Sequence, residues 1–352
     1  MKSNNFARNS QFTTHNYTMP AEWEKQESIL LAWPHHKADW PGKFAPIPWV
    51  YCEIIRHIAS YQKVRLLIQN AAAQKQAKDM LSQVHANLKN VEFFHIPTNR
   101  SWMRDTGPIV VRDSSGKKTI LDFKSTGWAK YPNHRLDNQV REQLNKKLKL
   151  PLVKPRHKGR HVVLEGGGID VNGKGTLITT EEWLLSDVQV RNPGFTRDDY
   201  EKIFAKYLGI NQVIWLGSGI AGDDTHGHVD DITRFVSADT IVTVVEKNTR
   251  DPNHAPLKEN LQRLKRLKKF NIVEVPMAKP LFFEDQRLPA SYANFLITNH
   301  AVLVPTFNDS NDRIALNILA ELFPKREVIG IHSVDLVWGF GTIHCLSQQE
   351  PK

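Results

Sequence analysis

The feature that most constrains the fold is a unit that recurs along the chain: an apolar strand, a loop crowded with glycine and acidic or polar residues, and then a strand or helix. The unit occurs in five segments, at 91–108, 161–171, 212–236, 301–312 and 328–345. Key loop residues are spaced at roughly 40 to 80 positions, in the order Asp105, Glu165, His228, Asn308 and Cys345. This spacing predicts about five related β/α modules in a ring, with their loops meeting at one end. We therefore expect one α/β domain at 19–352, preceded by a polar N-terminal tail at 1–18.

Length and composition exclude several classes of protein. The chain has 352 residues, of which 40% are hydrophobic and 24% are charged, as is typical of a globular protein. No run approaches the roughly 18 apolar residues of a membrane span, and the N-terminus lacks the apolar core of a secretory signal. We therefore expect a cytoplasmic protein with no membrane partner.

The two cysteines do not make a disulfide framework. Cys52 lies in WVYCEIIRHIASY, where apolar residues follow helical spacing, so we expect it to be a buried core residue. Cys345 lies in GFGTIHCLSQQEPK, seven residues from the C-terminus and shortly after two glycines. It is either a second core cysteine or a nucleophile that completes a site whose other residues come from earlier parts of the chain.

The formal net charge of +10 raises the question of a nucleic-acid partner. The densest basic run, 258–270, has leucines at 257, 261, 264 and 267, which form one helical stripe. Its lysines and arginines then form the opposite, solvated face, and no interleaved aromatics suggest base stacking. We expect no nucleic-acid partner, and the sequence leaves a homo-oligomer open.

Residues 217–222, GSGIAG, match the dinucleotide-binding pattern G-x-G-x-x-G and follow an apolar strand. The pattern requires a helix whose N-terminus faces the pyrophosphate. The segment that follows, 223–231, has four aspartates and no apolar helical stripe, and adjacent aspartates would repel a phosphate. We expect neither a nicotinamide nor a flavin cofactor.

The segment 223–236 carries the densest set of chemically useful residues. If the chain passes here from loop into strand, alternation puts His228 and Asp230 on one face and Asp231 on the other. Three interpretations compete: a metal site that includes His226, structural hydrogen bonding, and a general acid/base beside a cation-binding carboxylate. We favour the third, because no third and fourth metal ligands are evident nearby.

Two further loops carry carboxylates. Asp105 lies in SWMRDTGP, a turn ended by proline, where an aspartate often caps its own backbone. Glu165 precedes three glycines, which allow a ligand or backbone to approach closely, although a plain turn explains them equally well. Taken singly, neither carboxylate identifies a site.

Taken together, a thiol, a histidine and several carboxylates are suited to attack on a positively charged carbon. A cysteine with an ordinary pKa near about 8.5 is mainly a thiol at neutral pH and needs a cationic environment to react. A bound guanidinium supplies such a charge and is held best by two carboxylates. Its resonance-stabilised carbon is a poor electrophile, so a thiolate suits it better than a hydroxyl.

These stretches resemble the agmatine deiminase family, also called the Porphyromonas-type peptidylarginine deiminase family, within the guanidino-group-modifying penteins. The matching blocks extend from 19–41 to 341–349 and include WMRDTGP, DFKSTGWAKY, LEGGGIDVNGKGTLITT, DDTHGHVDD and SYANFLITNHAVLVPTFNDSND. The resemblance implies a five-fold pseudosymmetric β/α propeller, the pentein fold, and a deiminase catalytic domain. It also implies that no metal, nucleotide or other cofactor is required.

The resemblance further implies a reaction. Cys345 matches the family's nucleophile, His228 its general acid/base, and Glu165 the carboxylate that orients the histidine. The implied activity is a two-step hydrolytic deimination of agmatine through an amidino-cysteine adduct, with N-carbamoylputrescine and ammonia as products. This reaction belongs to polyamine metabolism, in putrescine biosynthesis.

The remaining implied residues bind the substrate. Asp105 and Asp230 match the carboxylates that hold the guanidinium, and Trp102 matches an aromatic that lines the aliphatic arm. Asn294 in SYANF is expected to form a polar wall. The partner is thus expected to be a small guanidino compound.

Three positions depart from the family pattern. Phe340 replaces the middle glycine before the nucleophile, Thr342 stands where asparagine is usual, and Ala129 stands where glycine is common. None removes a catalytic group, but Phe340 bears on which guanidine compound is used. The alternative substrate is peptidyl-arginine or free arginine, and the alternative of a different class is a non-catalytic guanidine-binding protein.

Overall fold

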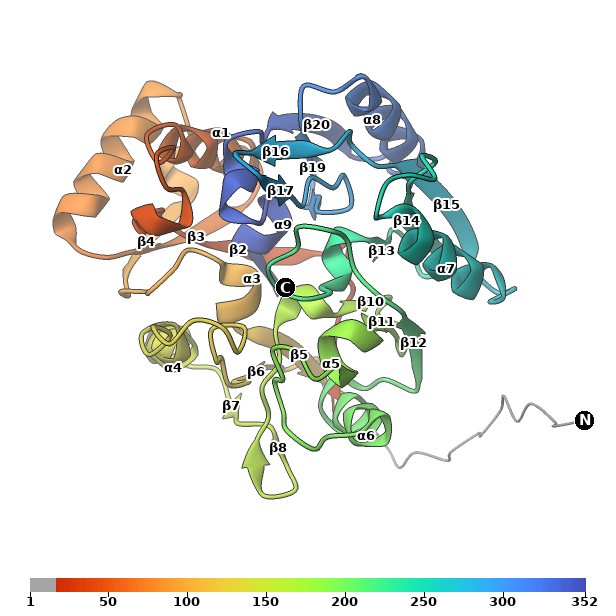
Figure 1. The fold of residues 1–352 in the computed structure, drawn as a ribbon. Helices are drawn as coiled ribbons and strands as arrows, with labels where there is room; N and C mark the ends of the chain where they lie inside the picture. The colour runs from red at the N-terminus through yellow and green to blue at the C-terminus, as the bar shows by residue number, and fades with distance from the viewer. Residues whose placement is uncertain (1–16) are drawn as a thin grey trace, which may run out of the picture.

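The protein was analysed as a computed structural model, which describes residues 17–352 (Figure 1). The tail expected at 1–18 lies outside the described residues except at its end, where β1 (Tyr17–Thr18) pairs with β5 (Ile109–Asp113). Regular structure among the described residues therefore begins two residues before the expected start at 19. Within residues 17–352, no helix combines the length and apolar character needed to cross a membrane.

Five sheets within the described residues repeat one pattern, in which a first strand pairs antiparallel with a second, and the second pairs parallel with a third. The triplets are β21 (Gln348–Pro351), β2 (Gln26–Ala32) and β3 (Lys63–Ile68); β5, β6 (Lys118–Leu121) and β7 (Leu152–Val153); β10 (Asp170–Val171), β11 (Thr176–Thr180) and β12 (Gln212–Leu216); β13 (Thr233–Phe235), β14 (Thr240–Val245) and β15 (Asn271–Pro276); and β18 (Leu296–Ile297), β19 (Ala301–Thr306) and β20 (Glu327–His332). β4 (Val91–His95) extends the first sheet. The predicted ring of five β/α modules is confirmed.

Helices connect the parallel strands, as a parallel pair requires a crossover. They are α1 (Ile47–Ala59), α2 (Ala71–Gln83), α4 (Val140–Leu148), α6 (Arg197–Leu208), α7 (His254–Lys265) and α8 (Ser310–Leu322). In Figure 1 these helices lie at the periphery, while the short helices α3 (Met103–Thr106) and α9 (Ile343–Leu346) lie nearer the middle. Capping boxes begin α6 and α8, so local sequence defines where these crossovers start.

The helical patterns read from the sequence are confirmed, except that α7 ends at Lys265, two residues before the last predicted leucine, Leu267. Cys52 is fully buried in α1, as expected for a core residue. In the basic run, Leu257 and Leu264 are fully buried while Lys258 and Lys265 are exposed. The positive charge of α7 is therefore the solvated face of an amphipathic helix.

The segment after 217–222 differs from a dinucleotide site and also from our strand prediction. It contains turns and the 3₁₀ helix η5 (Val229–Asp231), and β13 begins only at Thr233. The expected strand alternation at His228 and Asp230 is therefore wrong, because the chain turns through η5 before it becomes extended.

Candidate active site

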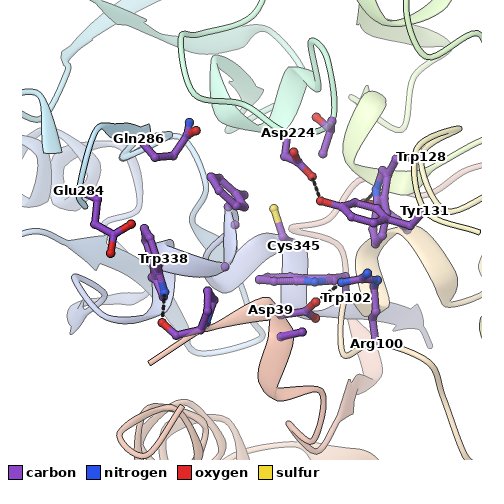
Figure 2. Close-up of a pocket in the computed structure, with 17 residues that line it drawn as sticks. Asp39, Arg100, Trp102, Trp128, Tyr131, Asp224, Glu284, Gln286, Trp338 and Cys345 are labelled. Atoms are coloured by element: carbon purple, nitrogen blue, oxygen red, sulfur yellow. Dashed lines mark hydrogen bonds and ion pairs between the residues drawn. The ribbon is translucent and has the colours of Figure 1, made fainter. Parts of the chain in front are cut away.

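The central loops of the modules surround a cavity of about 450 Å³. Aromatic and acidic side chains dominate its wall, including Asp39, Trp102, Asp105, Trp128, Tyr131, Asp224, Glu284, Trp338 and Phe340. Cys345 also lines it, although only 6% of this residue is exposed. Figure 2 shows the sulfur of Cys345 directed into the cavity, with Tyr131 and Trp128 on one side and Trp338 on the other.

The pseudosymmetry of the fold explains how residues distant in sequence meet. In every module, a polar residue of the site lies shortly before the antiparallel first strand: Asp105 before β5, Glu165 before β10, Asp230 before β13, Asn294 before β18 and Cys345 before β21. The prediction of Asn308 for the fourth module is wrong, because Asn308 is exposed where the chain turns outward from β19 into α8. The sequence pattern pointed to the six-residue strand β19, whereas the relevant strand, β18, has only two residues.

The glycine-rich approach to Cys345 is required by close packing. A Cβ at Gly341 would lie 2.9 Å from the Trp102 ring and 3.2 Å from Cys345 Sγ. A Cβ at Gly339 would lie 2.7 Å from the ring of Trp40, which itself packs against Trp102 at 5.3 Å between centroids. Between these glycines, Phe340 has a φ of 65°, a left-handed conformation that favours glycine, and its side chain lines the cavity.

Asn294 holds the nucleophile in place. Its Nδ2 donates to Cys345 Sγ at 3.1 Å and to Asp231 Oδ1 at 3.0 Å. Its Oδ1 accepts from Thr342 Oγ1 at 2.7 Å and from the backbone N–H of His344 at 3.1 Å. Asn294 is not among the residues that line the cavity, so its predicted role as a polar wall for the substrate stays a prediction, and Thr342, a departure from the family pattern, supports its bonded amide.

The second glycine of the Glu165 loop allows three functional side chains to meet. A Cβ at Gly167 would lie 2.5 Å from His228 Nδ1 and 3.1 Å from an oxygen of both Asp105 and Asp230. The backbone N–H of Gly167 donates to Asp105 Oδ1 at 2.9 Å, and Trp128 Nε1 donates to Asp105 Oδ2 at 2.8 Å. Burial raises the pKa of Asp105.

His228 is buried between two carboxylates. Its Nε2 is bonded to Glu165 Oε2 at 2.9 Å, and its Nδ1 lies 3.9 Å from Asp105 Oδ2 without a hydrogen-bond partner among residues 17–352. Burial by itself lowers the pKa of His228, but the charges of Asp105 and Glu165 raise it to about 9. These charges therefore favour the protonated ring, in which Nδ1 is the nitrogen without a partner among the described residues.

Glu165 is fixed by partners that the sequence did not indicate. Arg191 Nη2 and Trp183 Nε1 each donate to Glu165 Oε2 at 3.0 Å. Burial by itself raises the pKa of Glu165, but Arg191 and His228 lower it to about 2. Neither Arg191 nor Trp183 lies in a motif that would have identified it.

Asp230 and Asp231 both face the site, which corrects the predicted separation onto two faces. Asp230 Oδ2 lies 3.8 Å from Cys345 Sγ and accepts from His344 Nδ1 at 2.6 Å. Its Oδ1 is buried and has no hydrogen-bond partner in the described chain. Although burial acts to raise the pKa of Asp230, His344 holds it below its ordinary value. The tight turn of η5, in place of a strand, brings the two carboxylates together.

The metal interpretation loses one of its ligands. His226 Nε2 is bonded to Ser186 Oγ at 2.9 Å, so it is not grouped with His228 and Asp230. Among residues 17–352, the grouping with metal-ligand geometry is Asp230, Asp231 and Cys345, whose donor atoms lie within 4.8 Å of one another.

The thiol is not ionised in the unliganded site. Burial, together with Asp230 and Asp231, raises the pKa of Cys345 well above its ordinary value. A cation placed among these carboxylates would cancel their effect and favour the thiolate. The geometry therefore suits a nucleophile that is activated when a positively charged ligand arrives.

The outer part of the cavity has one cation among its lining residues, Arg100. Arg100 forms an ion pair with Asp39, and its guanidinium carbon lies 4.2 Å from the Tyr131 ring centroid. The hydroxyl of Tyr131 donates to Asp224 Oδ2 at 2.8 Å. Asp224, which also pairs with Lys130, and Glu284 complete the mouth of the cavity, whose described lining residues include more carboxylates than cations.

Comparison with known proteins shows likeness along nearly the whole chain. The sequence model of the Porphyromonas-type peptidyl-arginine deiminase family matches residues 18–351. Agmatine deiminase of C. jejuni, solved with substrate bound, is 33% identical, with a TM-score of 0.87 over 98% of this chain and 99% of that one. Agmatine deiminase of Enterococcus faecalis is 27% identical, with a TM-score of 0.85 over 96% of each chain. SxtG, an amidinotransferase of Microseira wollei, shares the fold at 11% identity, with a TM-score of 0.53 over 96% of this chain and 97% of that one.

Proposed function

The chain belongs to the Porphyromonas-type peptidyl-arginine deiminase family, and from this premise we propose that it hydrolyses the guanidino group of agmatine to a ureido group with release of ammonia. Family membership and the agmatine deiminase structures make it an enzyme that acts on guanidino C–N bonds. The products are N-carbamoylputrescine and ammonia, a step toward putrescine. The observation that carries the proposal is a cluster of a thiol, an imidazole and two buried carboxylates. Cys345 and Asp105 line the cavity, and behind them Asp230 Oδ2 lies 3.8 Å from Cys345 Sγ and His228 Nδ1 lies 3.9 Å from Asp105 Oδ2.

Asp105 and Asp230 bind the guanidinium from two sides. Both are buried, and the unpartnered Oδ1 of Asp230 supplies an acceptor for a guanidinium N–H. Charge-assisted hydrogen bonds between a guanidinium and a carboxylate are strong and directional. They orient the central carbon toward Cys345 Sγ, which lies 3.8 Å from Asp230 Oδ2.

In the first step, the bound cation lowers the pKa of Cys345, and the thiol loses its proton to solvent. The thiolate forms a bond to the guanidino carbon, giving a tetrahedral adduct. His228 transfers its Nδ1 proton to the departing nitrogen, the C–N bond breaks, and ammonia leaves. Glu165 keeps the Nε2 proton of His228 in place throughout, which explains its 2.9 Å contact.

In the second step, the neutral imidazole of His228 accepts a proton from water as the oxygen adds to the amidino carbon. The C–S bond then breaks, the electron pair returns to Cys345, the hydroxyl proton of the adduct passes to that sulfur, and the neutral ureido product leaves. His228 is again an imidazolium, as the charges of Asp105 and Glu165 favour. The two steps use only side chains of this protein and water.

The cavity mouth supports agmatine over arginine. Agmatine carries a second cation, and Glu284 offers a carboxylate along the outer wall, whereas Asp224 is already paired with Lys130. The α-carboxylate of arginine would need a cation, yet Arg100, the cation of the lining, is already paired with Asp39. Long-range repulsion by a net charge of +10 is screened beyond about 8–10 Å, so the local carboxylates dominate.

A substrate panel tests the proposal. Purified protein is incubated with agmatine, free arginine and an arginyl peptide, and the ureido product is measured colorimetrically. We expect product from agmatine at a rate well above that from either arginine compound. Product from an arginine compound alone would reassign the substrate, and product from none of the three would refute deimination.

A further inference from the structure

A buried chain of charges extends inward from Asp230. Asp230 Oδ2 bonds to His344 Nδ1 at 2.6 Å, and His344 Nε2 bonds to Glu22 Oε2 at 2.8 Å. The exposed fractions of the three side chains are 0%, 2% and 8%. Glu22 belongs to the N-terminal block of the sequence and is separated from His344 by 322 positions.

The hydrogen bonds of His344 define its charge. Each ring nitrogen faces a carboxylate oxygen, and an ionised carboxylate can only accept a hydrogen bond. Both nitrogens must therefore carry hydrogen, which makes His344 an imidazolium. Its backbone N–H is also bonded to Asn294, so the residue is held at both ends next to the nucleophile.

Glu22 is held in turn by buried cations. Arg234 Nη2 donates to Glu22 Oε2 at 2.8 Å, and Arg104 Nη2 lies 3.6 Å from the same oxygen. Arg234 also forms an ion pair with Asp170. Burial acts to raise the pKa of Glu22, but Arg234 and His344 hold it far below its ordinary value. The buried residues thus form a series in which negative and positive charges alternate. In order, they are Asp170, Arg234, Glu22, His344 and Asp230.

We propose that Glu22 is a positioning residue for the substrate guanidinium, acting through His344 to keep Asp230 ionised and its free Oδ1 available. The inference rests on the proposed function, because it concerns the carboxylate assigned to bind the guanidino group. A guanidinium at Asp230 is then the next cation of an alternating series. A buried charge is costly unless it is paired, so each member of the series depends on its neighbours.

The test compares Glu22→Gln with Glu24→Gln. Glutamine keeps the shape of Glu22 but carries no charge. If its amide nitrogen takes the place of Oε2, it donates to a neutral His344 and gives up the bond from Arg234. Glu24 is half-buried and pairs with Arg112, so its variant controls for the substitution itself. A neighbouring opposite charge shifts a carboxyl pKa by about 1–3 units, so we expect Glu22→Gln to raise the KM for agmatine roughly ten-fold and to change kcat less than about three-fold. Glu24→Gln should match the wild type.

A second measurement needs no altered Glu22. Nitrogen-15 NMR of histidine-labelled wild-type protein should show two protonated ring nitrogens for His344, assigned by their loss in His344→Asn. Glu22→Gln should convert one of them to an unprotonated nitrogen. An unprotonated nitrogen in the wild type, or equal KM values for the two glutamine variants, would overturn the inference. Absence of agmatine turnover in the wild type would instead refute the proposed function, and the NMR result would still decide the charge of His344.

Discussion

The two cysteines of the chain are both free and buried, yet their surroundings differ in kind. Cys52 lies fully buried in α1, and burial raises its pKa to about 12. Cys345 is bonded to the Asn294 amide and lies among carboxylates, and both burial and those charges raise its pKa. A raised pKa therefore does not separate a structural thiol from a nucleophile.

The two sites differ in whether a bound ligand can remove the cause of the raised cysteine pKa. A cation can neutralise the effect of Asp230 and Asp231 on Cys345, but no ligand changes the apolar packing around Cys52. The mechanism then requires that the thiolate form only when substrate is present.

The largest expected difference is in catalysis. Cys345→Ala removes the atom that forms the covalent adduct, so kcat for agmatine should fall by more than about 10⁴-fold. Cys52→Ala is the matched control and should retain activity within about two-fold, because its side chain lies outside the cavity lining. Ammonia release is the measurement. A near wild-type rate in Cys345→Ala would end the assignment of the nucleophile.

The next effect concerns the negative charge of Asp230, which lies beside Cys345; no such carboxylate raises the pKa of Cys52. Asp230→Asn keeps the shape of the side chain but removes the charge of one of the two carboxylates that bind the guanidinium. The value of kcat/KM should therefore fall by about 10²–10³-fold. Asp239→Asn, on an exposed aspartate, is the control and should be neutral. Equal kcat/KM values for the two variants would show that Asp230 does not bind substrate.

The two cysteines also show how far the sequence alone could reach. Helical spacing was enough to place Cys52 in a core, because the signal lies within one helix. The family motifs singled out Cys345 and Asp105, which line one cavity, and His228, whose Nδ1 lies 3.9 Å from Asp105 Oδ2. The ring of modules was equally readable, since strands and loops recur at regular intervals.

The supporting residues were not readable, because each acts on a partner far along the chain. Arg191 bonds to a glutamate 26 positions away, and Glu22 to a histidine 322 positions away. Asp231 was placed on the wrong face because η5 turns the chain before β13 begins. The strand pattern pointed to Asn308 as the key residue of the fourth module, because the two-residue strand after Asn294 gives almost no pattern; Asn294 entered only through the family resemblance.

A third prediction follows the ionisation of the thiol itself. Since Asp230 raises the pKa of Cys345, Asp230→Asn should lower it, and the midpoint of alkylation against pH should move to lower pH. At pH 7.5, Cys345 should be alkylated by iodoacetamide roughly ten-fold faster in this variant than in the wild type, since one pKa unit corresponds to about ten-fold in thiolate. Peptide mass spectrometry reports both cysteines in one sample. Modification at Cys52 should stay slow, and slower labelling at Cys345 in the variant would contradict the electrostatic account.

The smallest effect is on stability, where replacing Cys52 should cost more than replacing Cys345. Cys52→Ala leaves a small cavity in an apolar core and should lower the free energy of unfolding by about 1 kcal/mol. Cys345→Ala removes a buried thiol from a polar site that was shaped for reaction, so its stability should equal or slightly exceed that of the wild type. Urea unfolding midpoints of both variants provide the comparison. If Cys345→Ala proved the more destabilised of the two, the terminal thiol would be acting as core, and its exposure to the cavity would be incidental to its place in the fold.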